Sequence, residues 1–419
     1  MPMNIAIVGA AISGLVTAYI LSRDHDVTVF EKEKKAGGHA QTTLVDDGGR
    51  VLPIDTGFIV FNTLNYPMLN RLFETLGVRT HNSNMSFSVR CDKDDFEYNG
   101  SSLNKIFSQR RNLFHPEMWK MLKDILQFNR HAKQSLDRSV ADTVTVDDFL
   151  ASRGYSEAFA ERYLLPLGAS IWSSDCASFR KFPIRFVIEF LNNHSLLQLS
   201  GRPQWKTVTG SSKQYVEKLE HYLKGKLRHN ANVQYVDRKQ DRVEVYWNDN
   251  RVATFDEVIM ATHADTSIGT VANPDKEELD ILNKFPYQSN QACLHTDTRV
   301  LPSNRRAWGS WNYLVRENSE RAVCVTYNMN LLQGFDSPTT YCVSLNQGDL
   351  IRESQIIKHM QYQHPMFYPG RDEAQKKHSL LIRRRGISYC GSYWGSGFHE
   401  DGIRSALNVC DAFGMEATF

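Results

Sequence analysis

The chain has 419 residues, of which 41% are hydrophobic and 23% are charged, and this ordinary balance indicates a globular protein of two or three domains. Its 49 basic and 47 acidic residues leave a formal net charge of +2, which excludes the strong positive field of a nucleic-acid-binding protein. The seven cysteines include no CxxC pair, so we expect no metal site and a reducing, cytoplasmic compartment.

The chain opens with an uncharged apolar stretch, Ile5–Leu21. It is shorter than the roughly 20 residues that a membrane span needs, and no lysine or arginine precedes it, as a secretory signal would require. We expect instead a buried parallel strand over Asn4–Val8, a glycine-rich turn over Gly9–Gly14 and a helix over Leu15–Ser22. A second strand over Asp26–Glu31 ends in an acid.

This order of strand, glycine turn, helix, strand and acid is the context of a dinucleotide-binding fingerprint. Gly9 permits the tight turn, and Gly14 lets the helix pack close to the sheet. The backbone N–H groups of residues 10–14 suit a pyrophosphate at the start of the helix. Glu31 follows Gly14 by 17 residues, where a carboxylate accepts hydrogen bonds from a ribose and disfavours the 2′-phosphate of NADP.

Ala11 stands where the fingerprint asks for a glycine that lets the pyrophosphate approach closely. One extra methyl group against a ligand costs about 1–3 kcal/mol by analogy with overpacked cores, which a tightly bound flavin tolerates better than a nicotinamide. A second glycine pair, Gly37–Gly38, follows the acid. NAD does not need this pair, whereas the longer FAD molecule does lie across such a further turn.

The middle of the chain predicts a second structural unit. Glu117–Leu136 has apolar residues at helical spacing, and Thr145 begins a helix with a capping sequence. Gln234–Trp247 alternates like a pair of strands. Helices and an antiparallel sheet inserted between cofactor-binding pieces would form a discontinuous substrate domain.

Several motifs, in this order, resemble the amine-oxidase-like FAD superfamily over nearly the whole chain. Within it, they are most similar to bacterial predicted NAD/FAD-binding proteins that are associated with enzymes of the cyclopropane-fatty-acid-synthase type. The motifs are Gly9–Gly14 with Glu31 and Gly37–Thr42, Asp55–Asn62, Tyr163–Ser173, Trp205–Leu219, Ala261–Asp265, Ala307–Tyr313 and Gly391–Leu407.

The resemblance implies an α/β protein. A Rossmann-like FAD-binding domain of the glutathione-reductase type is expected over residues 1–85, 205–265 and 385–419. An α+β substrate domain is expected over residues 86–204 and 266–384.

The resemblance also implies the functional residues. Val233 would contact adenine through its main chain, and the N–H groups of Gly402 and Ile403 would face the flavin. The predicted FAD-binding residues are Gly9, Ala11, Ile12, Ser13, Gly14, Glu31, Lys32, Gly38, His39, Ala40, Thr56, Gly57, Phe58, Ile59, Val233, Ala261, Asp401, Gly402 and Ile403. The residues predicted to line the substrate pocket, as catalytic candidates, are Trp394, Phe398 and His399.

Three positions depart from the pattern of the superfamily. Residues 209–212 read TGSS where relatives show a glycine pair, and His39 replaces a frequent arginine. Phe398 stands where amine oxidases often present a tyrosine, and this argues against small amine substrates.

We therefore expect an FAD-dependent oxidoreductase that removes hydride from an organic substrate, with an unsaturated or methylated fatty acyl chain as the favoured candidate. A flavin-dependent isomerase and a flavin-free lipid-binding relic of the fold are the alternatives. Two short basic runs, Arg383–Arg385 and Lys376–Lys377, are interpreted as solvated surface or, alternatively, as a peripheral contact with anionic lipid head groups. The sequence leaves the oligomeric state open.

Overall fold

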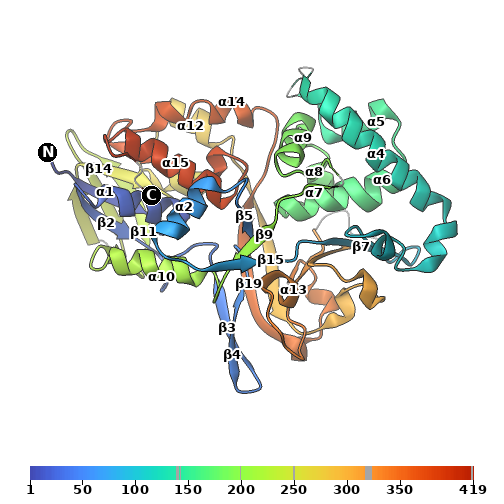
Figure 1. Cartoon of the computed structure of the whole chain (residues 1–419). Helices are drawn as coiled ribbons and strands as arrows, with labels where there is room; N and C mark the ends of the chain where they lie inside the picture. Colours follow the sequence, from blue (N-terminus) through green and yellow to red (C-terminus); the bar gives the residue numbers. More distant parts are fainter. Residues whose placement is uncertain (138–140, 142, 199, 249–250, 317–322, 417–418) are drawn as a thin grey trace.

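Two β-sheets of different construction organise the chain (Figure 1). A five-stranded parallel sheet has the strand order β10–β2–β1–β14–β20, and a seven-stranded sheet has the order β19–β15–β18–β17–β16–β7–β8. The computed structural model describes residues 1–137, 141, 143–198, 200–248, 251–316, 323–416 and 419.

The parallel sheet gathers strands from three distant parts of the chain. They are β1 (Asn4–Val8), β2 (Asp26–Phe30), β10 (Leu227–Arg228), β14 (Glu257–Met260) and β20 (Ile387–Tyr389). All of them fall within residues 1–85, 205–265 and 385–419, the ranges expected for the FAD-binding domain. The exact division into domains stays a prediction.

Both faces of the parallel sheet are covered, as its apolar strands require. Ile5 and Ile7 of β1 face one hydrophobic core, and Ala6 and Val8 face the other. The first core contains helices α1 (Ile12–Leu21), α2 (Pro67–Thr75), α10 (Lys213–Tyr222) and α15 (His399–Asp411). The second contains α11 (Ala264–Thr270), α12 (Lys276–Leu282) and the antiparallel strands β11 (Val233–Arg238), β12 (Val243–Trp247) and β13 (Arg251–Phe255).

The seven-stranded sheet is antiparallel except where β16 pairs with β7. Its strands are β7 (Phe87–Cys91), β8 (Phe96–Asn99), β15 (Tyr287–His295), β16 (Trp311–Val315), β17 (Val325–Asn328), β18 (Cys342–Leu345) and β19 (Ile356–Pro365). Helix α13 (Met329–Gln333) separates β17 from β18. Two smaller sheets comprise the hairpin β3 (Thr42–Asp47) and β4 (Arg50–Asp55), and strands β5 (Phe61–Asn62), β6 (Thr80–Asn82) and β9 (Trp205–Val208).

A helical layer lies beside the seven-stranded sheet, at the upper right of Figure 1. It contains α4 (Pro116–Asp137), α5 (Val146–Arg153), α6 (Glu157–Phe159), α7 (Leu165–Trp172), α8 (Cys176–Phe179) and α9 (Ile184–Asn193). The predicted helix near Glu117–Leu136 is confirmed as α4, and Thr145 caps α5 through a reciprocal hydrogen-bond pair with Asp148. Among the described residues, no helix is long and apolar enough to cross a membrane.

Two glycines shape the turn between β1 and α1. Gly9 has a φ of +103°, and a Cβ on it would lie 2.8 Å from the carbonyl oxygen of Ala261. A Cβ on Gly14 would lie 1.9 Å from the carbonyl oxygen of Gly9. The prediction that α1 begins at Leu15 was wrong, because this close approach lets the helix begin at Ile12 with Gly14 inside its first turn.

The close contact between Gly14 and the carbonyl of Gly9 predicts the effect of a substitution on stability. In Gly14→Ala the new methyl group meets backbone that cannot move aside, so we expect unfolding to become easier by about 3 kcal/mol and the bound flavin to be lost. Gly269→Ala is the matched control, because a Cβ there meets nothing within 4 Å and the helix gains about 0.5–1 kcal/mol. Thermal unfolding and the flavin absorbance per protein measure both effects. An unchanged Gly14→Ala protein would contradict the assignment.

Candidate active site

A cavity of about 410 Å³ extends from the parallel sheet to the seven-stranded sheet. At one end it is lined by Ala11, Ile12 and Ser13, at the start of α1. At the other end it reaches Tyr98, in β8, and Ser101, just after that strand. Its size is that of a pocket for a small molecule.

The start of α1 suits a negatively charged ligand. Ala11 is the N-cap and provides no side-chain hydrogen bond, and no acid occupies the first turn. The first intrahelical bond is donated by Leu15 to Ala11, at 2.9 Å. The N–H groups of residues 12–14 therefore lack partners within the helix, and with the helix dipole they form an anion site of the kind that binds a diphosphate.

Glu31 lies at the end of β2, next to this turn. Its buried carboxylate accepts hydrogen bonds from the N–H groups of Ala10 (3.0 Å) and Glu33 (2.9 Å). The main-chain carbonyl of Glu31 accepts from Ala231 (2.8 Å), which brings the segment before Val233 alongside. Each carboxylate oxygen has a second lone pair, so Glu31 is fixed in place while it retains the capacity to accept from a ribose.

The methyl group of Ala11 has a place in the structure. A Cβ on Gly38 would lie 2.6 Å from the Cβ of Ala11, so the second glycine pair leaves the space that Ala11 fills. Gly38 has a φ of +57°. The methyl group of Ala11 therefore occupies space that is free because Gly38, across the turn, has no side chain.

The hairpin β3–β4 brings a further segment to the cavity. A Cβ on Gly57 would lie 2.1 Å from the carbonyl oxygen of His39, and Phe58 donates to that carbonyl at 2.8 Å. Asp55, just before, is fully buried and accepts hydrogen bonds from the side chains of Thr42 and Ser212. Burial raises the pKa of Asp55 to about 7, against the opposing effect of these donors.

Four histidines meet in the cavity beside the cofactor end: His39, His263, His364 and His399. The ring of His39 lies 5.9 Å from that of His263 and 5.7 Å from that of His364, centroid to centroid. Burial lowers the pKa of His39 and His263 to about 4. The cluster is therefore uncharged at neutral pH. Among the described residues, no group of three His, Cys, Asp or Glu side chains is arranged to hold a metal ion.

His399 is held between two rings. It stacks on Phe58 at 3.7 Å between ring centroids, and its Nε2 lies 3.0 Å from the hydroxyl oxygen of Tyr215. Burial lowers the pKa of His399 to about 3. The ring of its neighbour Phe398 stacks on Phe190 at 5.3 Å, so the predicted pair lines the cavity wall where α15 begins.

The amide assignments at α15 need correction. The N–H of Gly402 donates to the carbonyl of Phe398 at 3.1 Å, and the N–H of Ile403 likewise lies beyond the first turn of the helix. Gly402 instead packs against Ile12, since a Cβ there would lie 3.0 Å from that side chain. The N–H groups free of intrahelical bonds are those of residues 399–401.

Asp401 does not face the cavity either. It is buried, and its carboxylate accepts from the N–H groups of Ser396 (2.9 Å) and Phe398 (3.0 Å). It therefore shapes the loop that presents Phe398. Trp394, predicted to line the pocket, stacks on His378 at 4.2 Å and packs on Phe285 in the second core.

The structure thus brings together part of the predicted set. The predicted residues that line the cavity are Ala11, Ile12, Ser13, His39, Thr56, Gly57, Phe58, Ile59, Ala261, Phe398 and His399. Those outside the lining are Gly9, Gly14, Glu31, Lys32, Gly38, Ala40, Val233, Trp394, Asp401, Gly402 and Ile403.

Sequence reasoning missed several lining residues, chiefly His263, His364 and Tyr362. Tyr362 shares a hydrogen bond with Thr56 at 2.7 Å, and Nδ1 of His364 accepts from the side-chain amide of Asn290 at 2.9 Å. Tyr362 and His364 are two residues apart on β19, so their side chains lie on the same face of the strand. This period-two spacing is the sequence signal that could have placed them together. His263 lies within the Ala261–Asp265 motif but carried no assigned role.

Fold and site together define a class: a flavoprotein oxidoreductase that holds FAD in a Rossmann-like domain. The family is also clear. The chain belongs to the flavin containing amine oxidoreductase family, whose model matches residues 12–323. A search of curated protein sequences found no match.

Solved structures share the fold. The CLA-producing fatty acid isomerase from P. acnes is 16% identical, with a TM-score of 0.69 and 98% of each chain covered. The cyclohexylamine oxidase from Brevibacterium oxydans IH-35A is 13% identical, with a TM-score of 0.71 and 98% of each chain covered. A putrescine oxidase bound to putrescine is 14% identical, with a TM-score of 0.69 and 99% of each chain covered.

The contact of Ala11 with Gly38 predicts a compensating pair. In Gly38→Ala two methyl groups collide, so FAD should bind about tenfold more weakly and the protein should unfold at a lower temperature. Ala11→Gly alone should bind FAD equally or more tightly. Combining the two should restore most of the affinity, apart from about 1–2 kcal/mol for an alanine at positive φ. Titration with FAD measures the affinities of the wild type, the two single variants and the double variant. A double variant that binds FAD no more tightly than Gly38→Ala would contradict the contact between residues 11 and 38.

The buried histidines predict acid sensitivity. The pKa of His263 falls from 6.5 to about 4 on folding, so its stabilising contribution is present above pH 6.5 and is lost as the pH falls toward 4. His263→Phe retains the stack on Tyr287 but cannot titrate. We expect its unfolding free energy, from urea titrations at pH 7, 6 and 5, to fall less steeply, by about 0.9 kcal/mol per pH unit on average. Replacing the exposed His221 with Phe should leave the slope unchanged; equal slopes for all three proteins would refute the prediction.

Proposed function

We propose that this FAD-dependent oxidoreductase removes hydride from an apolar molecule that carries an acidic group, of the fatty acyl type, with an unsaturated or methylated chain. One observation carries the proposal. Among the described residues that line the cavity, Arg202 is the single Asp, Glu, Lys or Arg side chain.

The charge of the lining distinguishes between substrate classes. A cationic amine entering a buried cavity needs a carboxylate or an electron-rich cage to replace its hydration. The described lining offers no carboxylate, and Phe398 lacks a hydroxyl group. An anion, in contrast, finds a guanidinium at Arg202, which is solvent-exposed and so marks the open end of the cavity.

The walls of the cavity suit an acyl chain. Phe58, Tyr163, Trp172, Trp311 and Tyr327 all contribute to them. Tyr163 lies in the π-helical turn Ala160–Leu164, a distortion that is frequent at functional sites. Each methylene group buried here contributes about 0.8 kcal/mol to binding, so length and kinks of the chain would set specificity.

The protein supplies position and electrostatics to the reaction. When bound, FAD accepts the hydride. Residues 12–14 would hold its diphosphate and Glu31 its ribose. The positive end of the α15 dipole, at residues 399–401, stabilises negative charge beside it. His399, with a pKa of about 3, is poorly matched to act as a base near pH 7, so we assign it and Phe398 to positioning the substrate.

A flavin-dependent isomerase is the second candidate. Its support is the fold shared with the CLA-producing fatty acid isomerase, together with the same apolar lining. An isomerase would rearrange the acyl chain with no net oxidation. The flavin-free relic is disfavoured, because Gly38 leaves room for the methyl group of Ala11, the one departure from the fingerprint at the diphosphate turn.

Anaerobic mixing tests the substrate class. The purified protein is mixed with oleic acid, with its methylated and cyclopropane derivatives and, separately, with primary amines. We expect the acyl acids to bleach the flavin band at roughly 450 nm and the amines to leave it unchanged. Rearranged acid recovered from an unbleached flavin would favour the isomerase. Bleaching by amines alone would overturn the proposal.

Arg202 provides the matched variant. Because its side chain is exposed, Arg202→Gln should fold normally. It should raise the KM for the acyl acid about tenfold or more, as expected for a lost charge-assisted contact, and leave kcat unchanged. Arg202→Lys should recover part of the loss, and a methyl ester of the same acid should respond to neither change. An unchanged KM would remove Arg202 from the site.

A further inference from the structure

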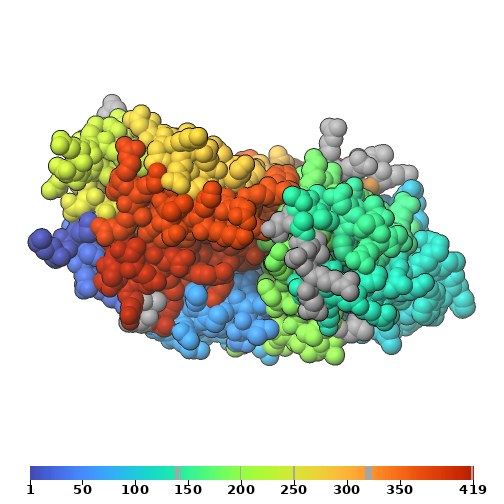
Figure 2. All heavy atoms as spheres, turned by 90° about the horizontal axis from the view of Figure 1, so that it is seen from above, coloured from blue at the N-terminus to red at the C-terminus, as the bar shows by residue number. Residues whose placement is uncertain are grey.

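Residues 103–136 carry an exposed surface of unusual composition, which we call the outer face. Its large apolar side chains are Leu103, Leu113, Phe114, Trp119 and Leu126, exposed by 75%, 40%, 88%, 52% and 53%. Single exposed apolar side chains are normal, whereas a cluster of this kind marks an interaction site. The segment forms the end of the molecule farthest from the N-terminus, in cyan and teal in Figures 1 and 2.

The members of the outer face adjoin one another. The indole N–H of Trp119 donates to the carbonyl of Leu113 at 2.8 Å, and its ring lies 5.6 Å from that of Phe107. Arg110 donates to the carbonyl of Phe107 at 2.9 Å. Helix α3 (Leu103–Ile106), the turn Arg110–Phe114 and the start of α4 therefore form one continuous surface.

The outer face is also strongly basic. Residues 103–136 contain seven lysines and arginines against two acids, whereas the whole chain has 49 against 47. Of the two acids, Asp124 is buried and accepts from Ser156, and Glu117 pairs with Lys120. Arg111 pairs with the exposed Asp95, just outside the segment. The excess of positive charge beside the exposed apolar side chains therefore comes from the other five cations, Lys105, Arg110, Lys123, Arg130 and Lys133.

Helix α4 interleaves the two kinds of side chain. Trp119, Lys123, Leu126, Arg130 and Lys133 follow one another at spacings of four and three residues, which places them along one face of the helix. All five are exposed, while Met118, Met121, Phe128 and Ala132 of the same helix are buried. A face with cations and large apolar groups together is typical of helices that lie in a membrane interface.

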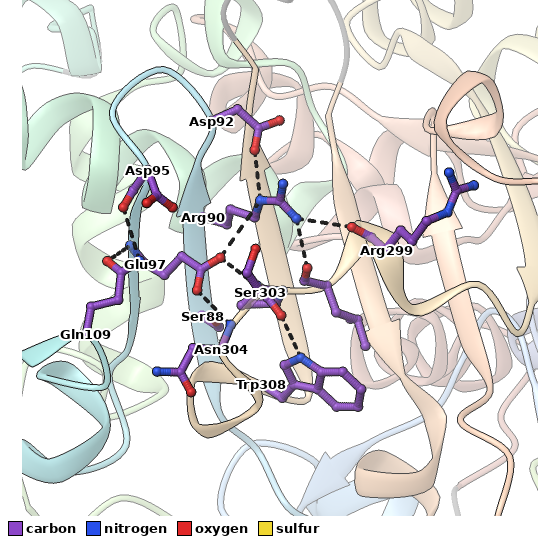
Figure 3. Close-up of polar contacts among 12 residues, drawn as sticks. Ser88, Arg90, Asp92, Asp95, Glu97, Gln109, Arg299, Ser303, Asn304 and Trp308 are labelled. Carbon is purple, nitrogen blue, oxygen red and sulfur yellow. Dashed lines mark hydrogen bonds and ion pairs between the residues drawn. The ribbon is translucent and has the colours of Figure 1, made fainter.

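A buried carboxylate holds the outer face in shape (Figure 3). Glu97, 1% exposed, accepts from the N–H groups of Ser303 (2.6 Å) and Asn304 (3.0 Å). Asn304 donates in turn to the carbonyl of Ser108 at 2.8 Å, and the N–H of Glu97 donates to Gln109 at 2.9 Å. The network fastens the loop before the exposed Arg305 and Arg306 to the outer face, so the surface is preformed.

The basic run Arg383–Arg385, noted in the sequence, forms ion pairs within the protein. Arg383 pairs with Glu257 and Arg384 with Asp275, at 2.9 and 2.8 Å, so their charge is partly neutralised within the protein. We propose that the outer face, and not this run, docks the enzyme on an anionic phospholipid bilayer. Phe114 and Trp119 would enter the head-group region, and the lysines and arginines would face the phosphates.

The position of the cavity agrees with this orientation. Tyr98, Gly100 and Ser101 line it, and Ser102 caps α3, whose first residue is the exposed Leu103. One end of the cavity therefore lies beside the outer face. A nucleic acid would meet the same charges, but it offers no apolar medium for the 88%-exposed Phe114.

Vesicle sedimentation tests the proposal with the flavin-loaded protein. Vesicles of phosphatidylcholine and phosphatidylglycerol in a roughly 2:1 ratio should bind it, and pure phosphatidylcholine or about 0.5 M salt should weaken binding markedly. The double variant Phe114→Asp with Leu126→Asp should partition at least about tenfold less. Its matched control, Leu44→Asp with Leu64→Asp, changes two side chains of 58% and 60% exposure elsewhere and should bind like wild type.

A second set of variants tests the role of charge in vesicle binding independently of the apolar side chains. Lys123→Glu with Lys133→Glu should reduce binding to anionic vesicles by about tenfold or more. Lys218→Glu with Lys224→Glu, on the exposed surface at α10, should have little effect. Flavin absorbance and melting temperature verify folding of every variant. The proposal is overturned if anionic vesicles do not bind wild type, if both aspartate pairs reduce binding equally, or if a single-stranded oligonucleotide binds and the vesicles do not.

Discussion

The close contact between Gly14 and the carbonyl of Gly9 determines where α1 begins, and the rest of the cofactor site is built around that helix start. With no side chain between them, α1 approaches the turn closely enough to begin at Ile12. The N–H groups of residues 12–14, which lack partners within the helix, then lie beside the cavity, where the helix dipole would stabilise a diphosphate. Helix α15 closes against α1 through Gly402, another residue without a side chain. Both helix starts meet at one place because glycines permit close packing.

The rest of the site is notable for how little formal charge it contains. Four half-buried histidines have pKa values lowered to about 3 to 4 by desolvation, and the carboxylate of Asp401 is directed into the loop before α15. Helix ends are therefore the principal electrostatic features around the cofactor end. In an apolar surrounding, such fixed dipoles act more strongly than they would in water. Among the described residues that line this cavity, the exposed Arg202 is the single Asp, Glu, Lys or Arg side chain, which is the basis for the proposed apolar substrate with an acidic group.

Much of the cofactor half could be read from the sequence, because its signals are local. The strand, glycines and Glu31 lie within about 30 residues, the usual span of such a unit, and each has a separate steric or hydrogen-bonding reason. The start of α1 was placed too late because the sequence pattern does not show how closely the backbone of Gly9 and Gly14 approaches within the turn. Gly402 and Trp394 were misassigned for a similar reason: the turn near residue 397 was known, but which groups it presents depends on Asp401. The histidines His39, His263 and His364 come from three distant segments, and no local pattern could show that they meet.

The parallel sheet has one consequence for how the protein is made. Its first strands are at the N-terminus, yet β14 and β20 occupy residues 257–260 and 387–389, and α15 ends at Asp411. A ribosome that has synthesised the nucleotide-binding turn must still add most of the chain before the sheet and the second helix can enclose it. Such long-range pairing folds slowly. The cofactor site is therefore complete only once α15 has been synthesised, and removal of α15 disrupts it as surely as deletion of β1.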